Sequence, residues 1–283
     1  MLNGCAYILT VDVGNTFIRF GLFAEDSAAA QERPLATCEI TTPSSITADE
    51  ARMRLAQVTA ALAADAGMPG ALVPTAAVLS CVVPALERPW KAALSRTCTG
   101  RVLTVGPGLK TGMPVHYDDP AEIGPDRIAD AVAARAVYGS PCIGIDFGTT
   151  TNIEVIDARG TFVGGVIAPG LALGARSLSA AAARLPQVEP SAPTHVIGRN
   201  TREAMRSGVV LGEVARIDGM LDMVLAEMRA TKAAGEGDVP IVITGDDAEA
   251  LASLVGHSLT VDDALTLRGL AELYRINQKP RRV

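Results

Sequence analysis

The sequence Ile8-Leu-Thr-Val-Asp-Val-Gly-Asn-Thr-Phe-Ile-Arg-Phe-Gly-Leu-Phe23 has the pattern of a strand, a tight polar turn and a second strand. A similar stretch follows later, Cys142-Ile-Gly-Ile-Asp-Phe-Gly-Thr-Thr-Thr-Asn-Ile-Glu-Val-Ile-Asp157. Each places an aspartate, Asp12 or Asp146, two residues before a turn glycine. One copy is equally typical of an ordinary hairpin. The repetition predicts two similar lobes that face each other across a nucleotide.

The residue types in the two turns suit a polyphosphate ligand. Glycine lets the backbone come close to a ligand, and the hydroxyl and amide groups at positions 15, 16, 149 and 150 offer hydrogen-bond donors. The aspartate that precedes each turn can hold a hydrated cation. A third candidate nucleotide contact is Val239-Pro-Ile-Val-Ile-Thr-Gly-Asp246, which has the pattern of a strand that ends in a glycine turn.

The composition is that of a chain that buries a core. Its 283 residues are 48% hydrophobic and 20% charged, and this length suffices for two lobes. Strand patterns alternate with helix patterns, such as the segment 47–66, which Thr47 and Glu50 can begin as a capping box. We therefore predict an α/β fold with one lobe at 1–115 and a second at 116–283.

Several classes of function are disfavoured by charge and by residue spacing. A net charge of −6 argues against a nucleic-acid surface, and the basic segment 279–282 is interpreted as a solvated tail. The cysteines show no C-x-x-C spacing and the three histidines have no ligand-like neighbours, which argues against disulfide or zinc frameworks. Neither a leader pattern nor a membrane-spanning segment is recognised, so the expected location is cytoplasmic.

The segment Gly124-Pro-Asp-Arg127 has two interpretations. Pro125 suits the first position of a helix, and Asp126 then lies in the first turn, where a carboxylate interacts well with the helix dipole. From spacing alone, Asp126 as a capping acid with Arg127 as its surface partner is the more ordinary interpretation. Its place between two phosphate-type turns instead favours a base for a hydroxyl nucleophile, beside a cation for the transferred phosphoryl group.

Taken together, these residues resemble the type III pantothenate kinases, bacterial members of the superfamily of acetate kinase, hexokinase, Hsp70 and actin. The resemblance covers almost the whole chain and implies two ribonuclease H-like lobes, an actin-like ATPase duplication with mixed central sheets flanked by helices, in a homodimer. The motifs that carry it are Asp12-Val-Gly-Asn-Thr16, Ser80-Cys-Val-Val-Pro84, Tyr117-Asp-Asp-Pro120, Gly124-Pro-Asp-Arg127, Asp146-Phe-Gly-Thr149, Gly165-Val-Ile-Ala-Pro-Gly170, Leu185-Pro186, Ile197-Gly-Arg-Asn-Thr201, Thr244-Gly245 and Leu265-Thr-Leu-Arg-Gly-Leu270.

The function that the resemblance implies is ATP-dependent phosphorylation of pantothenate to 4′-phosphopantothenate, the first step of coenzyme A biosynthesis. ATP is then expected with Mg²⁺, and Asp146 matches a ligand of a monovalent cation, K⁺ or NH4⁺. Asp126 matches the proton acceptor, and Arg127 is expected either to balance charge on the phosphoryl group or to bind the substrate carboxylate. The positions that match the ATP site are Asp12, Val13, Gly14, Asn15, Thr16, Phe17, Ile18, Arg19 and Thr149. Those that match the pantothenate site are Tyr117, Gly124, Pro125, Asp126, Arg127 and Ala182.

The chain departs from the family pattern at several positions. Pro125 replaces an Ala or Glu-like residue, Thr149-Thr-Thr-Asn152 replaces Thr-Ala-Thr-Thr, Ala182 stands where a threonine contacts pantothenate, and Asp246 replaces a glycine. Two alternatives therefore stay open: a catalytically weakened nucleotide-binding or regulatory paralogue, and a kinase for another small hydroxyl compound.

Overall fold

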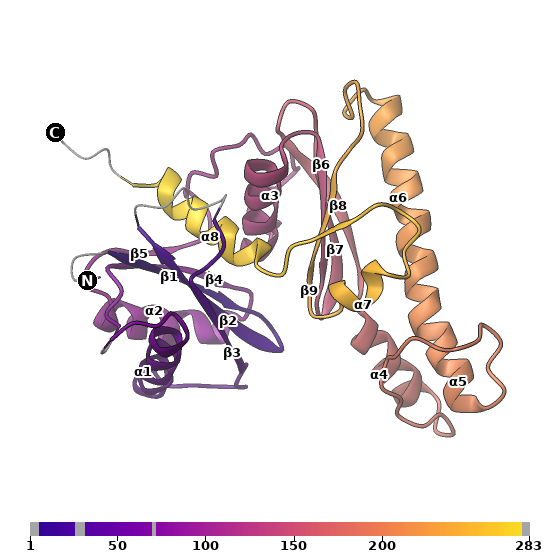
Figure 1. Ribbon diagram of the computed structural model, residues 1–283, viewed down its shortest axis with the longest axis horizontal. Coiled ribbons are helices and arrows are strands. Elements are labelled where there is room, and N and C mark those ends of the chain that lie inside the picture. Colours follow the sequence, from indigo (N-terminus) through magenta and orange to yellow (C-terminus); the bar gives the residue numbers. More distant parts are fainter. Residues whose placement is uncertain (1–5, 26–31, 70–71, 279–283) are drawn as a thin grey trace. The chain divides into compact units, whose positions relative to one another are not determined.

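The computed structural model describes residues 6–25, 32–69 and 72–278. The chain forms two compact units, the first made of Met1–Val137 with Ala264–Val283 and the second of Tyr138–Asp263 (Figure 1). Cys5 and the basic segment 279–282 lie outside the described residues, so their predicted roles are not addressed by the structure.

Each unit contains one mixed five-stranded sheet of the same topology. The first sheet has the order β3-β2-β1-β4-β5 and the second the order β10-β9-β6-β7-β8. In both, the first three strands pair antiparallel. A fourth strand pairs in parallel with the first, and a fifth pairs in parallel with the fourth. The repeated order confirms the predicted duplication. The strands of the first sheet are β1 (Tyr7–Val13), β2 (Phe17–Ala24), β3 (Ala36–Thr41), β4 (Ala76–Cys81) and β5 (Val102–Thr104). Those of the second are β6 (Cys142–Phe147), β7 (Thr150–Ile156), β8 (Phe162–Pro169), β9 (Ile241–Gly245) and β10 (Thr260–Val261).

The two faces of the first sheet have different partners, because side chains alternate along a strand. Leu9, Val11 and Val13 of β1 belong to a hydrophobic core with α1 (Ala48–Asp65) and α2 (Pro84–Thr97). The opposite face, which carries Asp12, is the one on which α8 (Leu265–Ile276) packs, over β1 and β4 (Figure 1). Helix α1 begins with the predicted capping box, since Thr47 Oγ1 accepts the Glu50 N–H at 3.2 Å.

The compact units differ from the predicted division after residue 115. Helix α3 (Pro125–Tyr138) belongs to the first unit up to Val137, and the chain returns to this unit for α8. The close contact between the two helices explains the difference: a Cβ on Gly269 of α8 would lie 1.9 Å from the carbonyl oxygen of Ala129 in α3. A linear boundary cannot capture a helix that returns from the far end of the chain.

The second sheet has its own hydrophobic core on one face. Ile143, Ile145 and Ile153 pack with apolar residues of α6 and its neighbours. A π-helical turn (Ser207–Leu211) lies between α5 and α6. The helices of this unit are α4 (Leu171–Ala181), α5 (Thr201–Arg206), α6 (Gly212–Ala230) and α7 (Ala248–Ala252). Among the helices of the described residues, none combines the length and apolar character that a bilayer crossing requires.

Candidate active site

A row of polar side chains crosses the first sheet near the turn between β1 and β2. Asp12 of β1 pairs in register with Arg19 of β2 and with Ser80 of β4, and Arg19 pairs with Glu39 of β3. Register partners point to the same face of a sheet, so the four side chains share one face. The Arg19 Nε atom lies 3.1 Å from the Glu39 Oε2 atom, which fixes the guanidinium group beside Asp12.

Asp12 is held in an environment that disfavours its negative charge. Its residue is 6% exposed, and its Oδ1 atom is buried with no hydrogen-bond partner among the described residues. Burial and the nearby charge of Asp126 raise the pKa of Asp12 from 3.8 to about 6, while Ser80 and Arg19 act in the opposite direction. A cation at the Oδ1 atom would offset both unfavourable effects, so this carboxylate fits a metal-bound phosphate.

Asp126 lies in the first turn of α3, as predicted. Its Oδ1 atom accepts the backbone N–H of Arg127 at 2.8 Å, so the carboxylate does interact with the helix N-terminus. Burial nevertheless raises the pKa of Asp126, although that hydrogen bond and the charge of Arg127 lower it in part. The charge of Asp126 also contributes to the raised pKa of Asp12, so the two acids lie within electrostatic range of each other. Asp126 therefore caps the helix and also lies near enough to Asp12 for the charges of the two groups to interact.

Three neighbours of Asp126 define the shape of its turn. Arg127 is only 5% exposed, so its interpretation as a surface partner is wrong. Pro125 is the first residue of α3, a position whose backbone N–H has no partner within a helix. Proline at this position therefore removes no helical hydrogen bond. A Cβ on Gly124 would lie 2.4 Å from the Asp126 Oδ1 atom, so a side chain there would displace the carboxylate.

The turn between β1 and β2 presents its tip to solvent. The Gly14 N–H donates to the Phe17 carbonyl at 3.0 Å, and the Thr42 hydroxyl donates to the Gly14 carbonyl at 2.8 Å. Thr42 also donates its N–H to the Thr16 carbonyl at 2.9 Å. Asn15 and Thr16 are exposed at the tip. The backbone is thus fixed from behind while the tip remains accessible to a ligand.

The corresponding turn of the second unit is one residue shorter. The last strand pair before it is Phe147 with Thr151, which leaves 148–150 in the turn, whereas the pair of Val13 with Ile18 leaves 14–17. A Cβ on Gly170 would lie 2.2 Å from the Gly148 carbonyl oxygen, so only glycine allows this approach. The second turn therefore repeats the plan of the first without copying its conformation.

Asp146 lies close to backbone oxygen and to Gly245 in the second unit. It pairs in register with Asn152 of β7 and Thr244 of β9, as Asp12 pairs with Arg19 and Ser80. Gly245 has a φ of +97°, and a Cβ there would lie 2.5 Å from the Asp146 Oδ1 atom and 2.4 Å from the Phe147 carbonyl oxygen. Carboxylate and carbonyl oxygens are the donors that hard cations prefer.

The remaining predicted residues are distributed over the two units. Val13 and Ile18 are buried in the first core and support the turn, and Tyr117 is half-buried in the segment before α3. Thr149 is half-buried in the second turn. Ala182 directly follows α4, where its N–H donates to the Leu178 carbonyl at 3.1 Å. The structure thus groups Asp12, Arg19, Asp126 and Arg127 in the first unit and places Asp146, Thr149 and Ala182 in the second.

Sequence reasoning assigned no role to several residues that shape these sites. Ser80 occurs in one of the resemblance motifs, but its place beside Asp12 follows from the parallel pairing of β1 with β4. Glu39 and Thr42 come from β3 and the residue after it. The alternation of side chains along each strand could have indicated which of these residues share a face of the sheet. The register that places them side by side could not be inferred from one sequence.

The comparisons with known proteins agree on one family. A family profile described as "Type III pantothenate kinase" matches residues 8–223. The chain is 38% identical over 275 residues to a type III pantothenate kinase of Koribacter versatilis (strain Ellin345), with 96% of each chain covered. It is 40% identical over 280 residues to one of Nocardia farcinica (strain IFM 10152), with 97% of this chain and 99% of the relative covered.

A solved structure supports the fold. The ROK hexokinase from Thermus thermophilus has a TM-score of 0.51 and 15% identity, with 96% of this chain and all of the hexokinase chain covered. At that identity the likeness shows the fold alone. It agrees with the expected actin-like arrangement of two mixed sheets flanked by helices.

Proposed function

The chain belongs to the type III pantothenate kinase family, and from this premise we infer that it phosphorylates pantothenate with ATP to give 4′-phosphopantothenate, the first step of coenzyme A biosynthesis. The observation that supports an active kinase most directly is the buried Asp12 Oδ1 atom, which has no hydrogen-bond partner among the described residues and so suits a metal-bound phosphate. Asp126, a candidate base, lies within electrostatic range of this carboxyl group.

Asp126 is the proposed proton acceptor for the primary hydroxyl of pantothenate. A general base works best when its pKa lies near the working pH, and burial raises the pKa of this carboxyl group. Its hydrogen bond from the Arg127 N–H fixes the carboxylate in one orientation, so the second oxygen is the one available to the hydroxyl. Direct in-line transfer needs no covalent phosphoenzyme.

Asp12 and the backbone of the turn at 14–16 are the proposed binding site for the ATP phosphates. The buried Oδ1 atom of Asp12 would ligate Mg²⁺ directly or through water, with phosphate oxygens supplying further ligands. When bound, Mg²⁺ neutralises negative charge on the phosphates during transfer. Arg19 lies beside Asp12 on the same face of the sheet and is held there by Glu39, which suits a role in orienting the polyphosphate.

Arg127 is assigned to the phosphoryl end of the reaction. It is buried directly next to Asp126, and its charge acts on that carboxyl group. The carboxylate of pantothenate lies at the opposite end of the substrate from the hydroxyl that Asp126 would deprotonate. Charge balance on the transferred group therefore fits the position of Arg127 better than binding of the substrate carboxylate.

The monovalent cation is assigned to the second unit. The Asp146 carboxylate and the Phe147 carbonyl are oxygen donors of the kind that would hold K⁺ or NH4⁺, and Thr149 of the adjacent turn would contact the nucleotide. We also propose a homodimer in which Ala182 takes the place of the threonine at the pantothenate site. Its methyl group cannot supply a hydrogen bond, which would weaken pantothenate binding by about 1 kcal/mol. A cytoplasmic location fits a reaction that consumes ATP.

The experiment that tests this function measures ADP release from purified protein with ATP, Mg²⁺ and K⁺ over a panel of acceptors. Pantothenate should be turned over, while glucose, glycerol and N-acetylglucosamine should not be, and the product should be 4′-phosphopantothenate by ³¹P NMR. Turnover of another alcohol without turnover of pantothenate would select a different small-molecule kinase. Nucleotide binding without turnover of any acceptor would select the regulatory alternative.

A further inference from the structure

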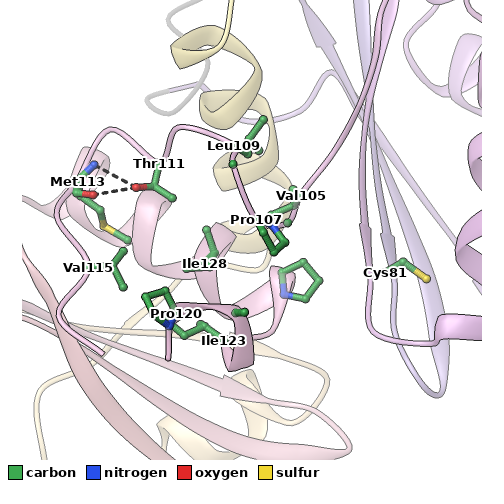
Figure 2. A pocket seen from close by; sticks show the side chains of 14 residues that line it. Cys81, Val105, Pro107, Leu109, Thr111, Met113, Val115, Pro120, Ile123 and Ile128 are labelled. Atoms are coloured by element: carbon green, nitrogen blue, oxygen red, sulfur yellow. Dashed lines mark hydrogen bonds between the residues drawn. The ribbon is translucent and has the colours of Figure 1, made fainter. Parts of the chain in front are cut away.

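The surroundings of Asp126 and of Thr149 differ in charge. Asp126 lies in the first unit, where the turn that opens α3 borders a cavity of 420 Å³ whose lining residues carry no charge (Figure 2). Thr149 lies in the second unit, in the turn at 148–150, and an ion pair lies close to that turn. The pair consists of Glu213 and Arg216, which are three residues apart at the start of α6. Neither residue belongs to the set that the family resemblance assigns to the site.

The Glu213 carboxylate has both of its oxygens engaged. The residue is 6% exposed, its Oε1 atom accepts the Thr151 hydroxyl at 2.8 Å, and its Oε2 atom forms the ion pair with Arg216. Thr151 is itself buried and pairs in register with Phe147, the strand pair that closes the turn at 148–150. Glu213 therefore fixes the strand residue on one side of the turn.

The Arg216 guanidinium acts on the other side of the same turn. Its Nη2 atom, which forms the ion pair, also donates to the Pro169 carbonyl at 2.6 Å, at the end of β8. The next residue, Gly170, donates its N–H to the Thr149 carbonyl at 3.1 Å, and a Cβ there would lie 2.2 Å from the Gly148 carbonyl oxygen. A displacement of Pro169 would therefore be passed directly to the turn.

The charge of Glu213 also reaches the turn that follows β9. Burial, Asp246 and Glu213 together raise the pKa of Asp247, which lies two residues after Gly245, the last residue of β9. A charge that is removed from water is strongly unfavourable unless it is paired. Arg216 supplies the partner of Glu213, so it balances a negative charge that would otherwise act on the surroundings of both turns.

We propose that Glu213 and Arg216 are positioning residues for the nucleotide, because together they hold the turn at 148–150 in the conformation in which Thr149 contacts ATP. The proposal rests on the proposed function and adds two residues to the nucleotide end of the site. Neither side chain needs to touch ATP. Loss of the guanidinium would release Pro169 and leave Glu213 as an unpaired negative charge beside a turn that faces phosphates.

The first test removes the guanidinium group and measures ATP binding. Arg216→Met keeps an unbranched side chain, and we expect the Kd for ATP, measured by titration calorimetry with Mg²⁺, to rise by about tenfold or more. KM for pantothenate should stay within about twofold of wild type. Arg159→Met is the matched control, because Arg159 also pairs with a buried carboxylate, Asp157, just beyond the other end of β7. It should bind ATP as wild type does.

Hydrogen exchange reports the turn itself and needs no ligand. The Gly148 N–H donates within the turn and the Gly170 N–H donates into it, each at 3.1 Å. Both amides should exchange about tenfold faster in Arg216→Met, because the turn opens more often, while amides of β6 keep their wild-type rates. Arg159→Met should leave the exchange of both glycine amides unchanged.

Two further variants separate the parts of the device. Thr151→Val removes the hydroxyl that Glu213 holds and keeps the side-chain shape, so it should speed exchange at the same two amides without disturbing the ion pair. It also tests the turn if Arg216→Met is too unstable to purify. Glu213→Gln in the Arg216→Met background removes the unpaired charge, so the double variant should bind ATP about threefold or more tightly than Arg216→Met alone.

The outcomes keep this proposal separate from the proposed function. If pantothenate is not turned over, but Arg216→Met still weakens ATP binding and loosens the two glycine amides, the function fails and the positioning role stands. Faster exchange with unchanged ATP affinity would overturn the proposal, because the ion pair would then support only the fold. Unchanged exchange in both Arg216→Met and Thr151→Val, an equal loss of ATP affinity in Arg159→Met, or weaker ATP binding by the double variant than by Arg216→Met would overturn it as well.

Discussion

Asp12 carries a carboxyl group that folding removes from water and places near a second acid. The sequence alone indicates this residue, since it precedes a glycine turn at the end of an apolar strand. The raised pKa could not be predicted, because it depends on burial within the sheet and on Asp126, which lies more than a hundred residues away in the chain. Ser80 and Glu39 were missed for the same reason: strand register brings them to the site.

The first prediction concerns the pH dependence of stability. The pKa of Asp12 is raised from 3.8 to about 6 in the folded state, so the folded state binds the proton more tightly. The stabilisation that the folded state gains from this tighter proton binding is complete below pH 3.8 and is lost as the pH rises through 6. Asp12→Asn removes the buried charge and should raise the free energy of unfolding by about 1–3 kcal/mol at pH 7.5, with little effect near pH 4.

Urea unfolding of wild type and Asp12→Asn over that pH range measures the difference. The same variant should lose kinase activity and the stabilisation that Mg·ATP gives to wild type, because it lacks the ligand for the cation. If the unfolding free energies of wild type and Asp12→Asn differ by the same amount at pH 4 and pH 7.5, burial does not destabilise the charged form of the Asp12 carboxyl group.

The role of Arg127 is tested by a conservative substitution. Arg127→Lys keeps the charge but shortens the side chain and removes the planar guanidinium group. If Arg127 stabilises the transferred phosphoryl group, kcat should fall by about 10–1000-fold with KM for pantothenate nearly unchanged. Steady-state kinetics separates the two roles, since a large rise in KM at constant kcat would instead assign Arg127 to the substrate carboxylate.

Helix α8 shows how one element positions another. It comprises Leu265–Ile276 at the end of the described chain. Its packing against α3 was not predicted, because the contact depends on Gly269 lying directly on the backbone of Ala129. The residue after it, Asn277, also holds the loop at Lys110, so the C-terminal segment contacts both α3 and the loop after β5.

Gly269→Ala should therefore be unfavourable although alanine is the better helix former. The added methyl group would lie 1.9 Å from the Ala129 carbonyl oxygen, so the two helices must separate. We expect a loss of about 1–3 kcal/mol in the free energy of unfolding, measured by urea denaturation. Gly219→Ala in α6 is the matched control, because nothing lies within 4 Å of its added methyl group, and it should stabilise the protein by about 0.5–1 kcal/mol. Similar effects at both positions would contradict close packing of α8 on α3.

At the scale of the whole molecule, the repeated Asp-x-Gly hairpin was sufficient to predict two similar halves. The two sheets share one strand order, so the inference from Asp12 and Asp146 to a duplicated fold is confirmed. The limits of the halves were not predictable, since α8 returns to the first unit from the end of the chain. The one-residue difference between the turns at 14–17 and 148–150 also escaped sequence reasoning, because both turns read as the same motif.

The most direct test of the account is pantothenate-dependent ADP release by wild type and by Asp126→Asn, with ATP affinity measured in parallel by titration calorimetry. Asparagine keeps the size of the side chain but cannot accept the hydroxyl proton. The account predicts that Asp126→Asn loses at least about 100-fold in kcat while it binds ATP as tightly as wild type. Turnover of pantothenate by Asp126→Asn at a rate near that of wild type would contradict it.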